Sequence, residues 1–246
     1  MASTRFPGKP LALLAGKPMV QWVVEAASEA GLGDDVLVAT PDEEIREAVE
    51  RFGGRAILTG NHHVSGTDRI AEVAASFPAD IYVNVQGDEP LIAPETIRAC
   101  AAPLLADESV AMASIWTECT PEEEPLPSVV KVVTDLDDFA LYFSRHPIPF
   151  PRQVRPAPLK KHVGIYAFRR DVLAMFAEWT PTPLEQTESL EQLRFLENGV
   201  RIKMARAEAS VVAVDTPEQA ILADDLLRRR VTPSSRPLPQ AKGERL

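Results

Sequence analysis

The chain has 246 residues, of which 45% are hydrophobic and 25% are charged, and this composition is typical of a globular protein rather than a disordered one. Its formal net charge of -10 argues against a basic nucleic-acid-binding surface. No apolar run is long enough to span a bilayer, and no secretory signal is visible, so we expect a cytoplasmic protein. Cys100 and Cys119 lack the spacing of metal ligands and are expected to be inert.

Helical and strand patterns alternate through the first half of the chain, which is typical of βαβ units and a mainly parallel sheet. We expect one helix from Pro18 to Ala30, a second that begins with Thr40 as its N-cap and ends at Gly53, and a third that Ser65 or Thr67 caps. The strands expected between and after these helices are residues 36–40, 56–59 and 81–85.

The second half predicts strands at shorter spacing and a change in sheet character. Strands are expected at 110–116, 129–134 and 140–143, around an acidic, proline-bearing loop at 120–127, and they indicate an inserted, partly antiparallel region. Two further strands, 163–168 and 200–205, flank one expected helix at 183–198, and a last strand at 211–214 leads into a C-terminal helix.

We therefore predict an α/β fold, a three-layer sandwich with a mainly parallel sheet and a partly antiparallel insertion. A single domain is expected over residues 1–230. The tail at 231–246 is rich in proline and polar residues, so we expect it to be disordered.

The first loop, from Ser3 to Leu11, combines hydroxyl groups, a glycine and two cations, Arg5 and Lys9. Such a loop can offer backbone N–H groups and positive charge to a polyphosphate. It has no strand before it, whereas phosphate loops of α/β folds normally follow the first strand. An exposed basic N-terminus is the alternative interpretation.

Two aspartates follow apolar strands at separate places in the chain. Asp88 lies in the segment Gln86–Pro90 directly after one strand, where open α/β sheets bind ligands and where a carboxylate can hold Mg²⁺. Asp215 follows another strand and precedes a helix, so taken alone it is more often a helix N-cap than a metal ligand. Because two strand ends can meet at one edge of a sheet, a shared metal site is the hypothesis that explains both residues.

An ordered set of motifs closely resembles the family of 3-deoxy-manno-octulosonate cytidylyltransferase, also called CMP-Kdo synthetase. The resemblance extends from Ala2 to about Leu227 and rests on the ordered set, since the Arg-x-Pro-Gly-Lys loop alone occurs across sugar nucleotidyltransferases. Its motifs are residues 3–11, 65–69, 83–90, 130–133, 140–145, 162–166, 188–194 and 214–218.

The resemblance implies a role for each matching residue. Ser3, Arg5 and Lys9 would bind CTP, together with Ser65, Arg69 and Asp88, and Arg5, Lys9 and Asp88 would be catalytic. Asp88 and Asp215 would bind Mg²⁺. The residues that match positions associated with the sugar acid are Gln86, Arg145, His162, Tyr166, Glu191 and Gln192.

The residue types fit these roles, because Arg145 can pair with a carboxylate and the other side chains can hydrogen-bond to hydroxyls. Without the resemblance, His162 and Tyr166 can equally be ordinary sheet residues. Glu191 and Gln192 can likewise be part of a solvated helix face.

The chain departs from the family pattern at its start. In the family a first strand and a Pro-Ala-Arg-Tyr turn precede the Ser-Thr-Arg loop, and both are missing from this chain. We expect this polypeptide to be less stable and less active than a form extended upstream.

The expected reaction joins CTP to Kdo, giving CMP-Kdo and diphosphate for lipopolysaccharide synthesis, in a magnesium-dependent homodimer. Transfer of CMP to another acidic sugar is one alternative. A catalytically silent nucleotide-binding protein is another.

Overall fold

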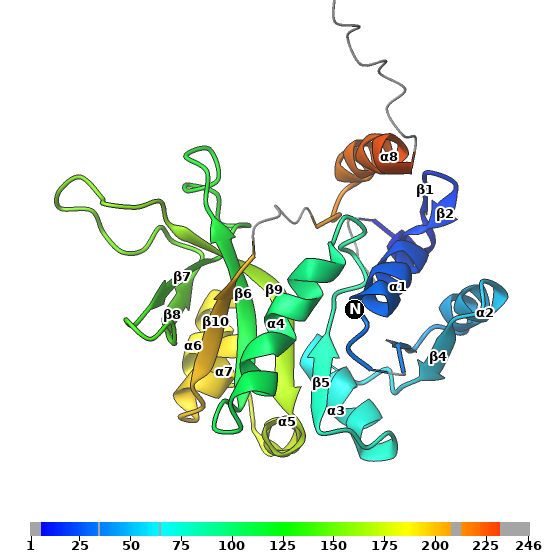
Figure 1. Cartoon of the computed structure of the whole chain (residues 1–246), viewed down its shortest axis with the longest axis horizontal. Helices are drawn as coiled ribbons and strands as arrows, with labels where there is room; N and C mark the ends of the chain where they lie inside the picture. Colours follow the sequence, from blue (N-terminus) through cyan, green and yellow to red (C-terminus); the bar gives the residue numbers. More distant parts are fainter. Residues whose placement is uncertain (1–5, 34, 64, 208–212, 232–246) are drawn as a thin grey trace, which may run out of the picture.

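The computed structural model describes residues 6–33, 35–63, 65–207 and 213–231, and in this part of the chain helices cover both faces of a six-stranded sheet (Figure 1). The sheet has the order β10-β6-β9-β7-β8, with β5 on the other edge of β9. Its strands are β5 (Ile81–Asn84), β6 (Met112–Glu118), β7 (Lys131–Thr134), β8 (Ala140–Ser144), β9 (Lys160–Arg169) and β10 (Ile202–Arg206). The predicted α/β class is confirmed.

Strand β9 gives the sheet its mixed character. It runs antiparallel to β5, β6 and β7, whereas β6 and β10 are parallel. Strands β5, β6 and β10 therefore all point the same way, and the antiparallel portion predicted for the middle of the chain is β7, β8 and β9.

Two apolar layers, one on each face of the sheet, make the sandwich. Along β9 successive side chains alternate between them, as the pleat of a strand requires: Tyr166 and Phe168 pack in one layer, Ile165 and Ala167 in the other. The first layer is completed by helices α3 (Gly66–Ser76), α5 (Arg170–Glu178) and α7 (Gln192–Glu197). The second is completed by α1 (Met19–Ala30) and α4 (Pro94–Ala106).

A third apolar cluster lies above the carboxyl end of the sheet. There α8 (Pro217–Val231) packs with α1 and with the hairpin of β1 (Leu13–Leu14) and β2 (Lys17–Pro18). Figure 1 shows α8 at this end, next to the β1–β2 hairpin. The C-terminal helix thus closes over the region in which the strand-end motifs lie.

Strands β3 (Leu37–Thr40) and β4 (Arg55–Leu58) form a separate parallel pair, with α2 (Glu43–Arg51) between them in the chain. A cavity of about 420 Å³ lies between β3 and β5 and is lined by residues of both strands. In the described residues β3 pairs only with β4, and β5 only with β9. Within the described residues, the β3–β4 pair is therefore not hydrogen-bonded to β5, and the cavity separates them.

The structure corrects several predicted elements. The single helix expected at 183–198 is two helices, α6 (Pro183–Glu188) and α7, because Ser189 adopts a left-handed conformation with φ of 52°. The second helix begins after Asp42, and Thr40 instead accepts a hydrogen bond from the Asp42 backbone with its Oγ1. Helix α5 was not among the predicted elements.

Two predictions at the C-terminal end fall partly outside the described residues. Of the strand expected at 211–214, only Ala213 and Val214 are described, and they are not in a strand. Of the tail at 231–246, the described part ends with Val231 at the end of α8.

Candidate active site

Lys9 joins two aspartates that are far apart in the chain. It begins a short 3-10 helix, Lys9–Leu11, after Gly8 in a left-handed conformation, and its side chain is almost buried. Its Nζ donates to Asp88 Oδ2 at 2.7 Å and to Asp215 Oδ1 at 3.1 Å. The strand-end carboxylates predicted to share a site therefore lie around one cation.

A backbone contact explains why the two aspartates meet. Asp88 lies in the turn after β5, and its carbonyl accepts a hydrogen bond from Val214 N at 2.8 Å. The following residue, Asp215, is fixed from the other side because Gln219 Oε1 accepts its N–H at 2.7 Å in the first turn of α8. The start of α8 is thus held against the end of β5.

The electrostatics of this cluster suit a divalent cation. Burial lowers the pKa of Lys9, but the hydrogen bonds and charges of Asp88 and Asp215 outweigh it, so the pKa lies above its usual value and the ammonium stays charged. One cation thus already satisfies two carboxylates. Mg²⁺ is commonly held by one or two carboxylates together with substrate phosphates and water.

Within the described ranges, no group of three or more His, Cys, Asp or Glu side chains is placed to hold a metal ion. Asp88 and Asp215 could hold a cation only if phosphate or water supplied its remaining ligands.

A polar pocket of about 400 Å³ opens beside the cluster. Asp215 and Gln219 line it on one side, and the start of β9 and the start of α7 line it on the other. Three residues predicted to bind the sugar acid contribute to its wall: His162, Tyr166 and Gln192. The structure thus brings half of the predicted sugar residues next to one predicted metal ligand.

These three residues form one chain of hydrogen bonds with Ser114. Tyr166 OH donates to Gln192 Oε1 at 3.2 Å, and Gln192 Nε2 lies 3.5 Å from His162 Nδ1. His162 Nε2 lies 2.9 Å from Ser114 Oγ, which donates to the Ile165 carbonyl at 2.8 Å. Because the serine proton is used there, the network assigns the imidazole proton to Nε2 and leaves Nδ1 as the acceptor from Gln192.

This wall of the pocket is uncharged. Burial lowers the pKa of His162 to about 3, so the imidazole is neutral at pH 7. Burial, and then the charge of Glu191, raise the pKa of Tyr166 well above its usual value, so the phenol keeps its proton. Neutral donors and acceptors of this kind suit the hydroxyl groups of a sugar.

The same pocket contains ionisable residues to which the sequence analysis gave no role. Glu89, directly after Asp88, is 5% exposed and its Oε2 has no hydrogen-bond partner among the described residues. Burial and the charge of Asp88 raise its pKa to about 8, against the opposing charge of Lys161. Lys161, directly before His162, donates to Glu123 Oε1 at 2.5 Å. The sequence could have pointed to Glu89 and Lys161 because each is next to a residue of a motif, Asp88 and His162 respectively.

Arg145 and Glu191 are not among the residues that line this pocket. The guanidinium of Arg145 donates from Nε to the Glu188 carbonyl at 2.7 Å, from Nη1 to the Pro127 carbonyl at 3.0 Å and from Nη2 to the Ser189 carbonyl at 3.1 Å. Glu191 Oε2 accepts the N–H of Thr67 at 3.4 Å. Arg145 and Glu191 thus each connect separate segments of the chain. Their assignment to the sugar acid stays a prediction.

The remaining predicted residues lie near the cavity between β3 and β5. Arg69 and Gln86 line that cavity, and Arg69 also donates to the Gly60 carbonyl at 3.1 Å. Ser65 caps α3. Its Oγ accepts a hydrogen bond from Asp68 N at 3.1 Å, and the Asp68 carboxylate accepts one from Ser65 in return. Ser3 and Arg5 lie outside the described residues.

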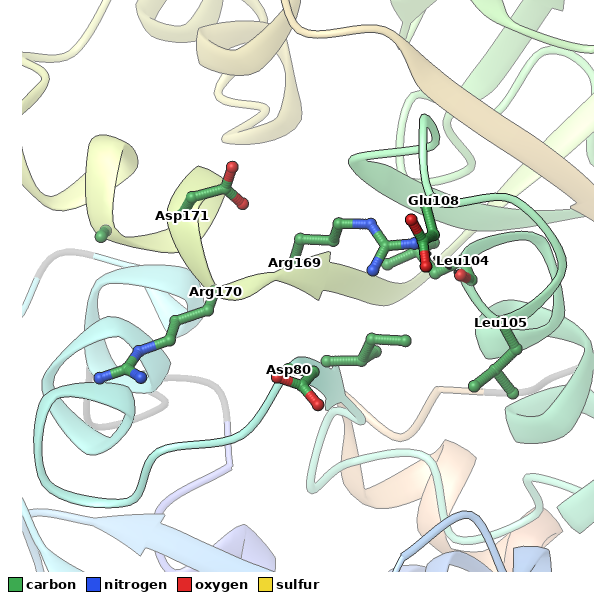
Figure 2. A pocket seen from close by; sticks show the side chains of 9 residues that line it. Asp80, Leu104, Leu105, Glu108, Arg169, Arg170 and Asp171 are labelled. Atoms are coloured by element: carbon green, nitrogen blue, oxygen red, sulfur yellow. Dashed lines mark hydrogen bonds between the residues drawn. The ribbon is translucent and has the colours of Figure 1, made fainter.

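A third hollow, of about 760 Å³, lies where β5 begins and β9 ends. Figure 2 shows Asp80, Glu108 and Asp171 there beside Arg169 and Arg170. Arg169 donates to the Leu104, Asp107 and Val110 carbonyls, which gives it a structural role. This hollow is remote from the strand-end motifs and is not part of the candidate site.

The comparisons with known proteins agree on one family. Residues 1–202 match the family model of the cytidylyltransferases. The 3-deoxy-manno-octulosonate cytidylyltransferase of Pelobacter propionicus is 50% identical over 92% of this chain and 94% of its own length. The enzyme of the same description from Geobacter metallireducens is 52% identical over 88% of this chain and 90% of its own.

A solved structure gives the same result. That of CMP:2-keto-3-deoxy-manno-octonic acid synthetase complexed with CTP superposes with a TM-score of 0.90 at 43% sequence identity, covering 93% of this chain and 95% of that one. The chain therefore belongs to the cytidylyltransferase family, within which it groups with the 3-deoxy-manno-octulosonate cytidylyltransferases.

Proposed function

We propose that this chain transfers CMP from CTP to 3-deoxy-D-manno-octulosonate, releasing diphosphate. The observation that carries the proposal is the convergence of Asp88 and Asp215 on Lys9, beside a pocket lined by His162, Tyr166 and Gln192. The first group suits a polyphosphate and its cation, and the second suits a polyhydroxylated sugar. Relatives that share about half of the residues carry the name of this activity.

In the proposed step, the anomeric hydroxyl of the sugar attacks the α-phosphorus of CTP in line with the departing diphosphate. The new O–P bond forms as the bond from the α-phosphorus to the bridging oxygen breaks, and the hydroxyl proton is lost to solvent. No covalent enzyme intermediate is needed. Positioning and charge stabilisation then account for catalysis.

Each group of residues has a part in that step. Lys9 stabilises the charge on the departing diphosphate, together with Arg5 and Ser3, whose assignment rests on the resemblance alone. Arg69 and Ser65 lie toward the nucleotide, with Gln86 near them. The uncharged wall of His162, Tyr166 and Gln192 orients the sugar by hydrogen bonds to its hydroxyls.

Magnesium is the cofactor that fits the two aspartates, and Asp88 and Asp215 would hold it. When bound there, it would neutralise charge on the phosphate oxygens. Lys9 already shows that one cation can contact both carboxylates.

The cellular setting follows from the resemblance. We infer a cytoplasmic homodimer that activates the sugar acid for lipopolysaccharide synthesis. No helix of the described ranges has the length and apolar character needed to cross a membrane.

Diphosphate release from CTP tests the proposal. The protein is mixed with CTP, Mg²⁺ and Kdo, and we expect diphosphate and CMP-Kdo in equal amounts, and none after chelation by EDTA. Purified amino-substituted Kdo and nonulosonic acids serve as competing substrates. A clear preference for one of these sugars would replace Kdo in the proposal, and CTP binding without diphosphate release from any of them would indicate a silent nucleotide-binding protein.

A further inference from the structure

The proposed substrate is an acid, and its carboxylate must find a cation in a pocket to which Glu123 and Asp215 contribute negative charge. Glu89, Glu123 and Asp215 line the pocket. A buried carboxylate that meets no cation is costly, so the position of the positive charge decides which sugars the pocket accepts.

Arg145, which the resemblance assigns to the sugar acid, is already engaged elsewhere. All three guanidinium nitrogens donate to backbone carbonyls, and these carbonyls belong to two separate segments, at Pro127 and at Glu188–Ser189. Turning Arg145 toward a ligand would leave those carbonyls without their donors. The geometry therefore favours Arg145 as a connection between the two segments.

Lys161 is placed differently. Among the described residues that line the polar pocket, it is the only lysine or arginine, and it shares the pocket with His162, Gln192 and Asp215. Its side chain is 11% exposed, so its charge acts in a largely desolvated setting. Its charge also reaches Glu89, whose pKa it lowers.

The one described partner of the Lys161 ammonium is a carboxylate on a loop. Nζ donates to Glu123 Oε1 at 2.5 Å, and the other oxygen of Glu123 accepts from Thr120 N at 3.0 Å. An ammonium has three N–H donors, so it can bind a second carboxylate beside Glu123. The pair with Glu123 shows that a carboxylate can bind the Lys161 ammonium in this pocket.

We propose that Lys161 recognises the carboxylate of the sugar acid and sets the selectivity of this chain for acidic over neutral sugars. The inference rests on the proposed function. It adds a specificity-determining residue at the start of β9, directly before His162, which belongs to the hydroxyl-binding wall.

The proposed contact between Lys161 and the sugar carboxylate can be tested by removing the charge of either partner. We would measure KM for Kdo and for its methyl ester with the unmodified protein and with Lys161→Met, which keeps the length and removes the charge. The unmodified protein should bind the ester roughly 10–100-fold more weakly than the acid, because a hydrogen bond to a charged group is lost. In Lys161→Met the KM for Kdo should rise by a similar factor, the preference for the acid should disappear, and the KM for CTP should stay within about twofold.

Lys160→Met is the matched control. Lys160 precedes Lys161 on the same strand, but its Nζ donates to Thr134 Oγ1 at 2.7 Å and lies over the Trp116 ring, outside the pocket lining. It should leave the acid preference unchanged. Lys161→Arg should keep the preference if the charge is what matters, and Lys161→Gln, which also removes the charge, replaces the methionine variant should that one not fold.

The inference would be overturned if Lys161→Met kept the acid preference, whether both KM values stayed the same or both rose by the same factor. Calorimetric titration of Kdo and its ester into both proteins gives the same comparison without turnover. If the proposed reaction itself is wrong, the unmodified protein releases no diphosphate. That result differs from a loss of acid preference, so the two failures can be told apart.

Discussion

Lys9 and Arg194 are both nearly buried cations held by two carboxylates, yet their surroundings differ. The partners of Lys9, Asp88 and Asp215, have side chains 31% and 43% exposed, so solvent and ligands can reach them. Arg194 is 3% exposed and binds Glu185, itself 11% exposed, with Asp68 at 3.6 Å. A nearly buried cation between two carboxylates can thus belong to a site or to the scaffold, and the accessibility of the carboxylates distinguishes the two.

The largest expected effect is on the scaffold pair. Arg194→Met should destabilise the protein by about 3–5 kcal/mol, because it leaves Glu185 buried without its partner. Chemical denaturation measures the change. The double variant Arg194→Met with Glu185→Gln should recover part of the loss, and Arg229→Met, which removes an exposed pair with Asp225, should leave stability unchanged. A loss no larger for Arg194 than for Arg229 would remove the distinction drawn above.

The next effect is on turnover alone. Asp215→Asn should lower kcat roughly 10²–10³-fold, about 3–4 kcal/mol of transition-state stabilisation, because one of two cation-binding carboxylates is lost. The melting temperature should change little, since the side chain is partly exposed. Asp225→Asn, on the outer part of α8, is the control and should keep full activity. Near-normal turnover in Asp215→Asn would contradict the shared cation site.

Lys9→Met sharpens the comparison by removing the cation itself. Turnover should fall roughly 10–100-fold, because a charge beside the departing diphosphate is lost. The two carboxylates then face each other without an ammonium, so Mg²⁺ alone should raise the melting temperature of the variant more than that of the unmodified protein. Lys17→Met, which removes a partly exposed pair with Glu25, should show neither change. Equal magnesium responses in all three proteins would count against the cation site.

The smallest expected effect concerns the uncharged wall. The pKa of His162 is lowered to about 3 by burial, whereas an unfolded histidine titrates near 6.5. Between these values the unfolded chain binds more protons, so stability is fully present above about pH 6.5 and falls as the pH drops, by at most about 1.4 kcal/mol per pH unit. Denaturation midpoints from pH 7 to pH 5 measure the slope. His162→Gln should flatten it, and an unaltered slope would mean that the imidazole is not held neutral.

Local sequence signals determined much of the fold. The apolar periodicity predicted α1, α3 and strands β3 to β5, because a helix or strand with one buried face repeats its apolar residues at the period of that element. The left-handed turn at Ser189 carries no such signal, since the residues on both sides of it are good helix formers, and the sequence therefore predicted one helix where two exist.

The motifs also determined which chemistry to expect. Asp88 was predicted from its place directly after an apolar strand, and Lys9 from a loop that combines glycine with cations. The order of the motifs along the chain indicated the family. No local pattern, however, states which of several cations faces a ligand.

Only the tertiary structure decided how these residues are used. Asp215 reaches Asp88 because the backbone of Val214 bonds to the end of β5, a contact between distant segments. Arg145 is held by carbonyls of segments that the sequence does not show to be neighbours, while Lys161, which no motif singled out, lies in the pocket. The physical reason is that a side chain's role depends on which donors, acceptors and charges surround it, and folding brings most of those from far along the chain.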